Sequence, residues 1–189
     1  MTVIQQFFSL LLVALTLGAH PSGASLEERR VRASPTVAYQ TARDAFGLLR
    51  GQAEDLPRHL QSHLAKILSS GTYRLTPRAV QHRRIAGQSA WVFLDRNMIC
   101  LSQGHGGGAA CSTAGNAAKA GISLGVFSPP NRRYPKPHDF SLLGLAPDGI
   151  SRVVIAIGGR AHTIPVKTNL YTASAEQPII VRRYVREGH

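Results

Sequence analysis

Residues 140–167, FSLLGLAPDGISRVVIAIGGRAHTIPVK, decide the fold that the sequence predicts. Three runs rich in β-branched and aliphatic residues alternate there with two short segments that favour turns. The runs are 140–146, 150–157 and 161–167, and the turns are Pro147-Asp148-Gly149 and Gly158-Gly159-Arg160. Because short turns of this kind join neighbouring antiparallel strands, the stretch predicts two consecutive β-hairpins.

Further strand candidates lie on both sides of these hairpins. Residues 89–94 (SAWVFL) and 98–102 (MICLS) flank Asp95-Arg96-Asn97, and this pattern is typical of another hairpin. The remaining candidates are 122–127, 169–173 and 179–185, with one short strand allowed at 72–75. The sequence predicts that about five to seven of these candidates form one antiparallel sheet.

Two helices are expected before most of the strands. Residues 39–50 carry apolar side chains at helical spacing, with Ser34-Pro35 as the upstream boundary. The second helix is expected at 57–69, where Pro57 suits the first helical turn and Gly71 follows the end.

The segment 104–121 is rich in glycine and alanine, and we expect a loop there with one helical turn allowed after Cys111. Hydrophobic residues make up 43% of the chain, which is enough to bury a core. The fold class that follows is α+β, with one domain at 39–185 in which the helices precede or cover the antiparallel sheet.

The N-terminus has the pattern of an export signal. Residues 7–17 (FFSLLLVALTL) form an apolar run, and Ser22-Gly23-Ala24 fits a cleavage site, so 1–24 is expected to be a signal peptide. The run is shorter than the ~20 residues that span a bilayer. Because no Lys or Arg precedes Phe7, a retained anchor and a buried helix of a cytosolic protein stay open as alternatives. Residues 25–38 are expected to be a flexible lead-in, and the mature protein is expected to be secreted or held in the cell envelope.

The chain has two cysteines, Cys100 and Cys111. In an oxidising compartment they are close enough in sequence to form a disulfide between a strand end and the following loop. Two free thiols are one alternative. A zinc site built with His105 is another, but it lacks a fourth ligand at a familiar spacing.

The formal net charge of +12 comes mainly from arginine, with 18 Arg against 4 Lys. A surface of this charge attracts acidic cell-wall polymers, anionic membrane surfaces or nucleic acid, although a solvated basic surface without a ligand is equally consistent with the composition. The basic groups are Arg29-Arg30-Arg32, Arg78 with Arg83-Arg84, Arg132-Arg133-Lys136 and Arg182-Arg183-Arg186. Nucleic acid is the less favoured partner because neither a recognisable module nor stacking aromatic residues accompany these groups.

Two short matches to hydrolase motifs occur. Residues 105–108 spell HGGG and residues 121–125 spell G-x-S-x-G, and the order Ser123, Asp148, His162 completes a literal catalytic triad. The elbow motif requires a helix directly after the serine, whereas VFSPPN follows it here. We therefore expect no catalytic residues, with an extracellular hydrolase centred on Ser123 kept as an alternative.

His59 and His63 are four residues apart on the second expected helix, so both could face one metal ion. No third ligand is identifiable beside them, and a solvent-facing helix edge explains the pair. We expect no metal site and no cofactor.

Four segments together resemble a known family. They are 46–57 (FGLLRGQAEDLP), the two-cysteine segment 91–111, 144–154 (GLAPDGISRVV) and 164–172 (IPVKTNLYT). In their order and spacing the chain is similar to a family of uncharacterised exported actinobacterial proteins, over roughly residues 39–175, with Ile150 where valine is usual. The resemblance implies export and a disulfide, and it brings no known activity.

The function that these observations favour is a secreted or envelope-associated binding or structural domain without catalysis. The alternatives are the Ser123-centred hydrolase and a surface protein that binds polyanions. Neither the ligand nor the oligomeric state follows from the sequence.

Overall fold

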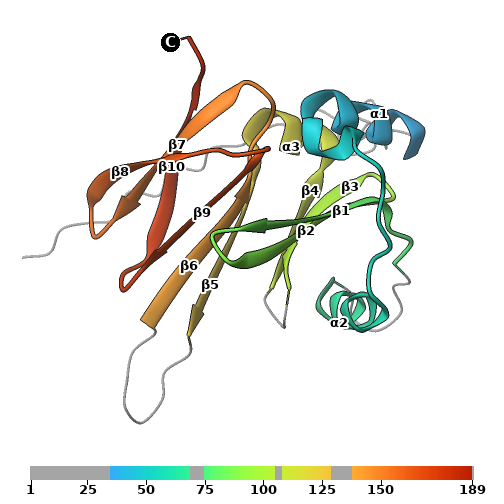
Figure 1. Ribbon diagram of the computed structural model, residues 1–189, viewed down its shortest axis with the longest axis horizontal. Coiled ribbons are helices and arrows are strands. Elements are labelled where there is room, and N and C mark those ends of the chain that lie inside the picture. The colour runs from blue at the N-terminus through green and yellow to red at the C-terminus, as the bar shows by residue number, and fades with distance from the viewer. Residues whose placement is uncertain (1–34, 69–74, 105–107, 129–137, 189) are drawn as a thin grey trace, which may run out of the picture. The chain divides into compact units, whose positions relative to one another are not determined.

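The computed structural model describes residues 35–68, 75–104, 108–128 and 138–188 (Figure 1). The helices of this part of the chain are α1 (Pro35–Ala45), the 3-10 helix η1 (Gly47–Arg50), α2 (Arg58–Leu68) and α3 (Ala114–Ala120). The strands are β1 (Arg78–Ile85), β2 (Gln88–Asp95), β3 (Met98–Gln103), β4 (Ala109–Thr113), β5 (Ile122–Ser128), β6 (His138–Leu145), β7 (Ile150–Ile157), β8 (Arg160–Pro165), β9 (Leu170–Ala175) and β10 (Ile179–Arg186). No helix among the described residues is long and apolar enough to cross a membrane. The expected signal peptide, 1–24, lies outside the described residues.

The strands form three antiparallel sheets. Sheet A has the order β1-β2-β3-β4, sheet B the order β5-β6-β9, and sheet C the order β10-β7-β8. The predicted combination of helices with antiparallel β-structure is confirmed. The predicted number of strands is wrong, since the described residues contain ten strands in three sheets.

The two strands that the sequence did not reveal are the edges of sheet A. β1, RAVQHRRI, is dominated by basic and polar residues, and β4, AACST, contains small ones. Edge strands are often short or carry charged side chains, because these features discourage pairing with another chain. The expected short strand at 72–75 lies mostly outside the described residues, and β1 begins only at Arg78.

The predicted hairpin between 140–146 and 150–157 is wrong. β6 pairs with β5 and β9, whereas β7 pairs with β10 and β8. The Pro147-Asp148-Gly149 turn therefore carries the chain from sheet B to sheet C. The predicted β2–β3 and β7–β8 hairpins are confirmed.

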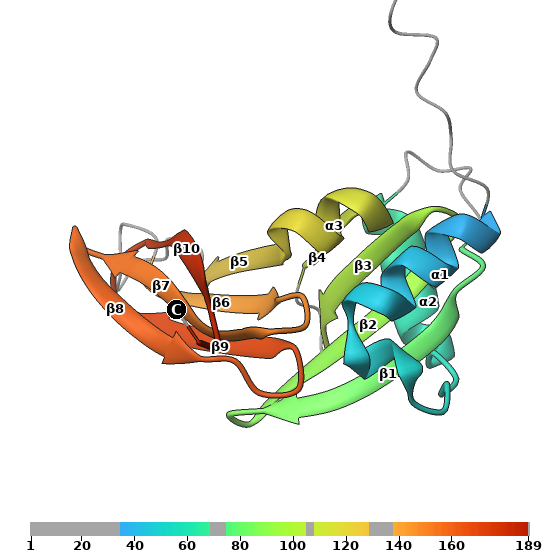
Figure 2. The same ribbon diagram turned by 90° about the horizontal axis from the view of Figure 1, so that it is seen from above.

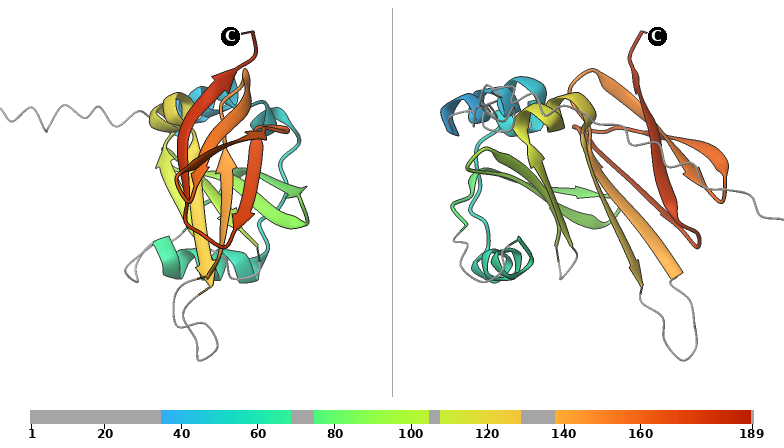
Figure 3. Two further views of the ribbon diagram at one scale, coloured as in Figure 1. Left: turned by 90° about the vertical axis from the view of Figure 1, so that its left-hand side faces the viewer. Right: turned by 180° about the vertical axis from the view of Figure 1, so that it is seen from behind.

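The sheets are stacked in layers, with sheet B between sheets A and C (Figures 1 and 2). The first core fills the space between sheets A and B and contains Ala38, Ala42, Phe46, Leu48, Leu49, Ala90, Val92, Leu94, Ile99, Leu101, Ala114, Ala117, Ile122, Leu124, Leu143, Leu145 and Leu170. The second core, between sheet A and α2, contains Leu56, Leu60, Leu64, Val80, Phe93 and Cys100. The third core, between sheets B and C, contains Leu142, Ala146, Val153, Ile155 and Tyr171. In Figure 3, α1 and α3 lie at one end of the strands, while α2 lies at the other.

The helices depart from the prediction at their boundaries. α1 begins at Pro35, so the expected flexible lead-in of 25–38 is wrong for its last residues, and Ala38 is buried in the first core. The helix expected at 39–50 is interrupted at Phe46, whose backbone is extended, and η1 follows. α3 occupies much of the expected loop 104–121, where it lacks the apolar stripe of longer helices because alanine provides its buried contacts.

Cys100 and Cys111 form the predicted disulfide, and neither free thiols nor a zinc site describes them. They are directly opposed on β3 and β4, with their Cα atoms 4.1 Å apart. The expected position of the bridge is wrong in one respect, since Cys111 lies in a strand rather than in a loop. The bridge therefore fastens an edge strand to the sheet on the face that α2 covers.

Gly144 makes room for the largest side chain of the third core. It lies in β6 between Ser123 of β5 and Tyr171 of β9, which are its partners in the two ladders. A Cβ atom at Gly144 would lie 1.8 Å from Cζ of Tyr171, so the phenol ring crosses the sheet where no side chain stands. The Tyr171 side chain is fully buried.

We predict that Gly144→Ala destabilises the fold by about 3 kcal/mol, because the buried ring has no space into which it can move. Chemical denaturation measures the change. Gly125→Ala is the matched control in β5, where an added Cβ meets nothing within 4 Å, and it should change stability by less than about 1 kcal/mol. Equal effects of the two variants would contradict this account of Gly144.

Candidate functional site

The structure does not bring the literal triad together. Ser123 lies within β5 rather than on a strand-to-helix elbow, and its Oγ is 3.0 Å from the Tyr171 hydroxyl. Asp148 lies in the turn after β6 and contacts α1 and η1. His162 is exposed on β8, opposite Ile155. The HGGG residues 105–107 lie outside the described residues.

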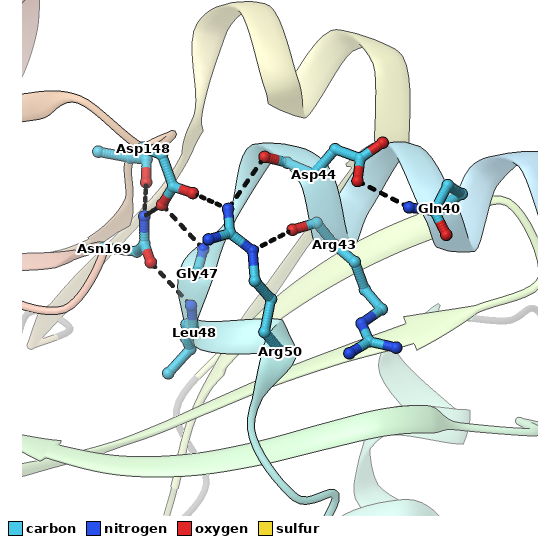
Figure 4. A network of polar contacts seen from close by, with 9 residues as sticks. Gln40, Arg43, Asp44, Gly47, Leu48, Arg50, Asp148 and Asn169 are labelled. Carbon is cyan, nitrogen blue, oxygen red and sulfur yellow. Dashed lines mark hydrogen bonds and ion pairs between the residues drawn. The ribbon is translucent and has the colours of Figure 1, made fainter.

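Asp148 instead organises a polar cluster at the start of η1 (Figure 4). Its Oδ1 accepts hydrogen bonds from the Gly47 amide and from Nδ2 of Asn169, both at 2.8 Å. Asn169 Oδ1 accepts a further bond from the Leu48 amide at 2.9 Å. Because the first amides of a helix lack partners within it, these two side chains cap η1 from positions distant in the sequence.

The same cluster caps the end of α1. Arg50 forms an ion pair with Asp148 and also donates hydrogen bonds to the carbonyls of Arg43 (2.9 Å) and Asp44 (3.1 Å). The Asp148 amide donates to the Ala45 carbonyl at 2.8 Å. Carbonyls at a helix end need such partners, so the Asp148 carboxylate is satisfied by structural contacts.

Residues from three of the four segments singled out in the sequence, 46–57, 144–154 and 164–172, meet in this cluster. Arg50 comes from the first of these three, Asp148 from the second and Asn169 from the third. Their role in the described contacts is to hold the helices against the turns. The cluster therefore accounts for these residues without assigning them a reaction.

A chain of three hydroxyl groups joins sheets B and C. Ser123 Oγ lies 3.0 Å from the Tyr171 hydroxyl, which lies 2.9 Å from the Tyr184 hydroxyl. Burial raises the pKa of the Tyr171 phenol well above its ordinary value, while the Ser123 hydrogen bond lowers it and Tyr184 raises it further. A phenol that holds its proton this firmly is a poor base for activating Ser123.

The raised pKa of the buried Tyr171 phenol implies that the fold loses stability at alkaline pH. Below about pH 10 the phenol is protonated in both the folded and the unfolded chain, whereas above it only the unfolded chain releases the proton readily. We predict that the free energy of unfolding falls above about pH 10, and that Tyr171→Phe makes this fall shallower. Ser123→Ala is the matched control, because it removes a hydroxyl from the same chain but leaves the phenol. Denaturation at several pH values measures the slopes, and identical slopes for both variants would contradict the prediction.

The part of the chain that the structure describes groups no histidines into a metal site. His59 is exposed on α2, while Nε2 of His63 is buried and has no hydrogen-bond partner among the described residues. His82 stacks on Trp91 with ring centroids 4.3 Å apart, and its Nε2 lies 3.2 Å from Ser89 Oγ. Within the described ranges, no three His, Cys, Asp or Glu side chains are grouped to hold a metal ion.

A groove of about 560 Å³ lies where β1 of sheet A approaches β8 and β9. The lining residues from β1 and its turn are Arg83, Arg84, Ile85 and Ala86, and those from β8, β9 and the turn between them are Ile164, Pro165, Lys167, Thr168, Leu170 and Thr172. Figure 2 shows the β1–β2 hairpin extending toward β9, and the Thr172 hydroxyl lies 3.2 Å from Gln88 Oε1. We call this site the basic groove.

The charged side chains that line the basic groove are all positive. Arg84 and Lys167 are exposed, and neither has an ion-pair partner among the described residues. Arg83 is different, since its guanidinium donates to Glu54 at 3.3 Å and to Gln81 Oε1 at 2.8 Å. None of the described residues that line the groove is acidic, so Arg84 and Lys167 supply its unpaired positive charge.

Two tight turns flank the groove, and one of them is strained. In the β8–β9 turn, Thr168 has φ 49° and Asn169 has φ 64°, and in the β1–β2 turn Ala86 has φ 46°. A β-branched residue such as Thr168 rarely adopts a positive φ, because its side chain crowds the backbone. The contacts of Asn169 with Asp148 and Leu48 hold the turn in this conformation. Strain of this kind is often retained at binding sites.

We predict that Thr168→Asn stabilises the fold by about 1 kcal/mol, because asparagine tolerates a positive φ. Thr163→Asn is the matched control in β8, where the backbone is extended, and it should lower stability slightly because asparagine disfavours strands. Thermal and chemical denaturation measure both changes. A loss of stability in Thr168→Asn would show that the threonine side chain makes a contact that outweighs the strain.

Sequence reasoning found only part of the basic groove. Arg83-Arg84 stood out as a basic pair, but Lys167 and Leu170 gave no signal because they lie more than 80 positions away in the sequence. Turn-forming residues at 86–87 and 168–169 were the available clue.

In the comparisons with known proteins, no family model, no curated protein and no solved structure matches this chain.

Proposed function

We propose that this protein is an exported, non-catalytic binding domain that holds an anionic ligand in the basic groove. Acidic cell-wall polymers and anionic lipid head groups are the ligand classes available in the envelope. The observation that carries the proposal is that Arg84 and Lys167 have no ion-pair partner among the described residues and that the described lining of the groove contains no carboxylate.

The two cations supply complementary contacts. An arginine guanidinium presents a planar fork of donors that matches a phosphate or a carboxylate, and a lysine ammonium acts as a mobile point charge. Both groups are free to exchange water for a ligand, since neither must break an ion pair first. Arg83 would add little, because Glu54 already neutralises it.

Export is supported by the disulfide between Cys100 and Cys111, which is compatible with an oxidising compartment. It also agrees with the signal-like N-terminal segment of the sequence. The hydrolase alternative has less support, because Ser123 lies against a phenol that keeps its proton and the other two triad residues are occupied or placed elsewhere.

Binding of fluorescently labelled polyphosphate, measured by anisotropy, tests the proposal. We expect binding to weaken as salt rises, because screening reduces attraction between exposed charges. The double variant Arg84→Gln/Lys167→Gln should weaken binding about tenfold, which corresponds to ~1.4 kcal/mol for two exposed charge-assisted contacts.

Arg58→Gln/Lys119→Gln is the matched control, because it removes the same two charges from exposed positions on α2 and α3. It should retain most of the binding. Equal losses in the two double variants would show that net charge acts alone, and the basic groove would then be the wrong site.

A further inference from the structure

We infer that the ligand of the basic groove is a small amphiphile with one anionic head group and an apolar tail. This inference rests on the anion-binding function proposed above and names the ligand class for that site. The expected ligand is a single small molecule rather than a long polyanion.

The apolar part of the groove is backed by packed core. Ile85 packs against the first core and Ile164 against the third, while Leu170 belongs to the first core and is 1% exposed. The groove therefore runs over the seam where the two cores approach the surface. An alkyl or aromatic tail placed there would extend the hydrophobic contacts of both cores and lose its contact with water.

Two of the polar side chains that line the groove already have partners within the protein. Thr172 is one of them, since its Oγ1 donates to the Leu142 carbonyl at 2.8 Å. Arg83 is held by Glu54 and Gln81. Arg84 and Lys167 are left as the charged contacts, which suits one phosphate or carboxylate.

The groove gives a long polyanion little advantage over a single phosphate group. The affinity of a polyanion grows with the number of charges that it neutralises, and the groove offers two unpaired cations. The volume of about 560 Å³ lies instead within the ~300–1,000 Å³ typical of small-molecule sites. Such sites combine apolar surface with polar groups that orient the ligand, and the described lining of the basic groove is divided evenly between five apolar and five polar residues.

Calorimetric titration with inorganic phosphate, butyl phosphate and octyl phosphate, all below the micelle concentration, tests the inference on the intact protein. We expect each buried methylene to tighten binding about fourfold, until the chain leaves the groove. Octyl glucoside, which has the tail without the charge, should bind more weakly than octyl phosphate.

Variants separate the two parts of the site. Arg84→Gln/Lys167→Gln should weaken octyl phosphate binding about tenfold while keeping the dependence on chain length. Ile164→Ala should reduce the gain per methylene, whereas Ile180→Ala on β10, an exposed position outside the groove, should not. Circular dichroism checks that each variant is folded.

The outcomes distinguish the two proposals. Equal affinity for inorganic and octyl phosphate, with binding still lost in the Arg84/Lys167 variant, would overturn the amphiphile and leave the anion site standing. If octyl phosphate binds the Arg84→Gln/Lys167→Gln variant as tightly as it binds the unchanged protein, the anion site itself is overturned. If neither polyphosphate nor any alkyl phosphate binds, both proposals fail.

Discussion

The arrangement of this protein depends on the contacts of the Asp148 carboxylate. It joins the amide of Gly47 at the start of η1, the guanidinium of Arg50 and the side chain of Asn169. Through them it closes α1, begins η1 and holds the turn between β8 and β9. That turn forms one side of the basic groove, so a contact within the fold positions the site that we propose for the ligand.

A second constraint is that the central strand of sheet B, β6, contributes side chains to a core on each of its faces. β6 turns Leu143 and Leu145 to the first core and Leu142 to the third, which Ala146 joins directly after the strand. Tyr171 can lie in the third core only because Gly144 leaves space above the central strand. The packing of sheet B therefore depends on the absence of a side chain at Gly144 as well as on its apolar side chains.

The basic groove is formed where the edge of sheet A approaches the connection between sheets C and B. Sheet A contributes β1 as an edge strand, and the β8–β9 connection links sheet C to sheet B. Where these edges approach, the side chains of two cores come close to the surface beside Arg84 and Lys167. A binding site at such a junction needs no special motif, because it is made by elements that pack for other reasons.

Local chemistry explains which features could be predicted. The turn residues and β-forming runs were enough for the β2–β3 and β7–β8 hairpins, and the close spacing of Cys100 and Cys111 was enough for the disulfide. The edge strands β1 and β4 escaped prediction because they carry few large apolar residues. The partners of β6 escaped it because strand pairing across sheets depends on which apolar faces meet, and no turn encodes that.

The amino-acid sequence by itself determined the secondary-structure class, the antiparallel character of the strands, the disulfide and the excess of positive charge. The division into three sheets, the partners of Ser123, Asp148 and His162, and the place where Arg84 meets Lys167 were decided only by the tertiary structure. The physical reason is that hairpins and short disulfide loops depend on residues close together in the chain. The groove depends instead on residues from opposite halves of the domain, which the packing of the three cores brings together.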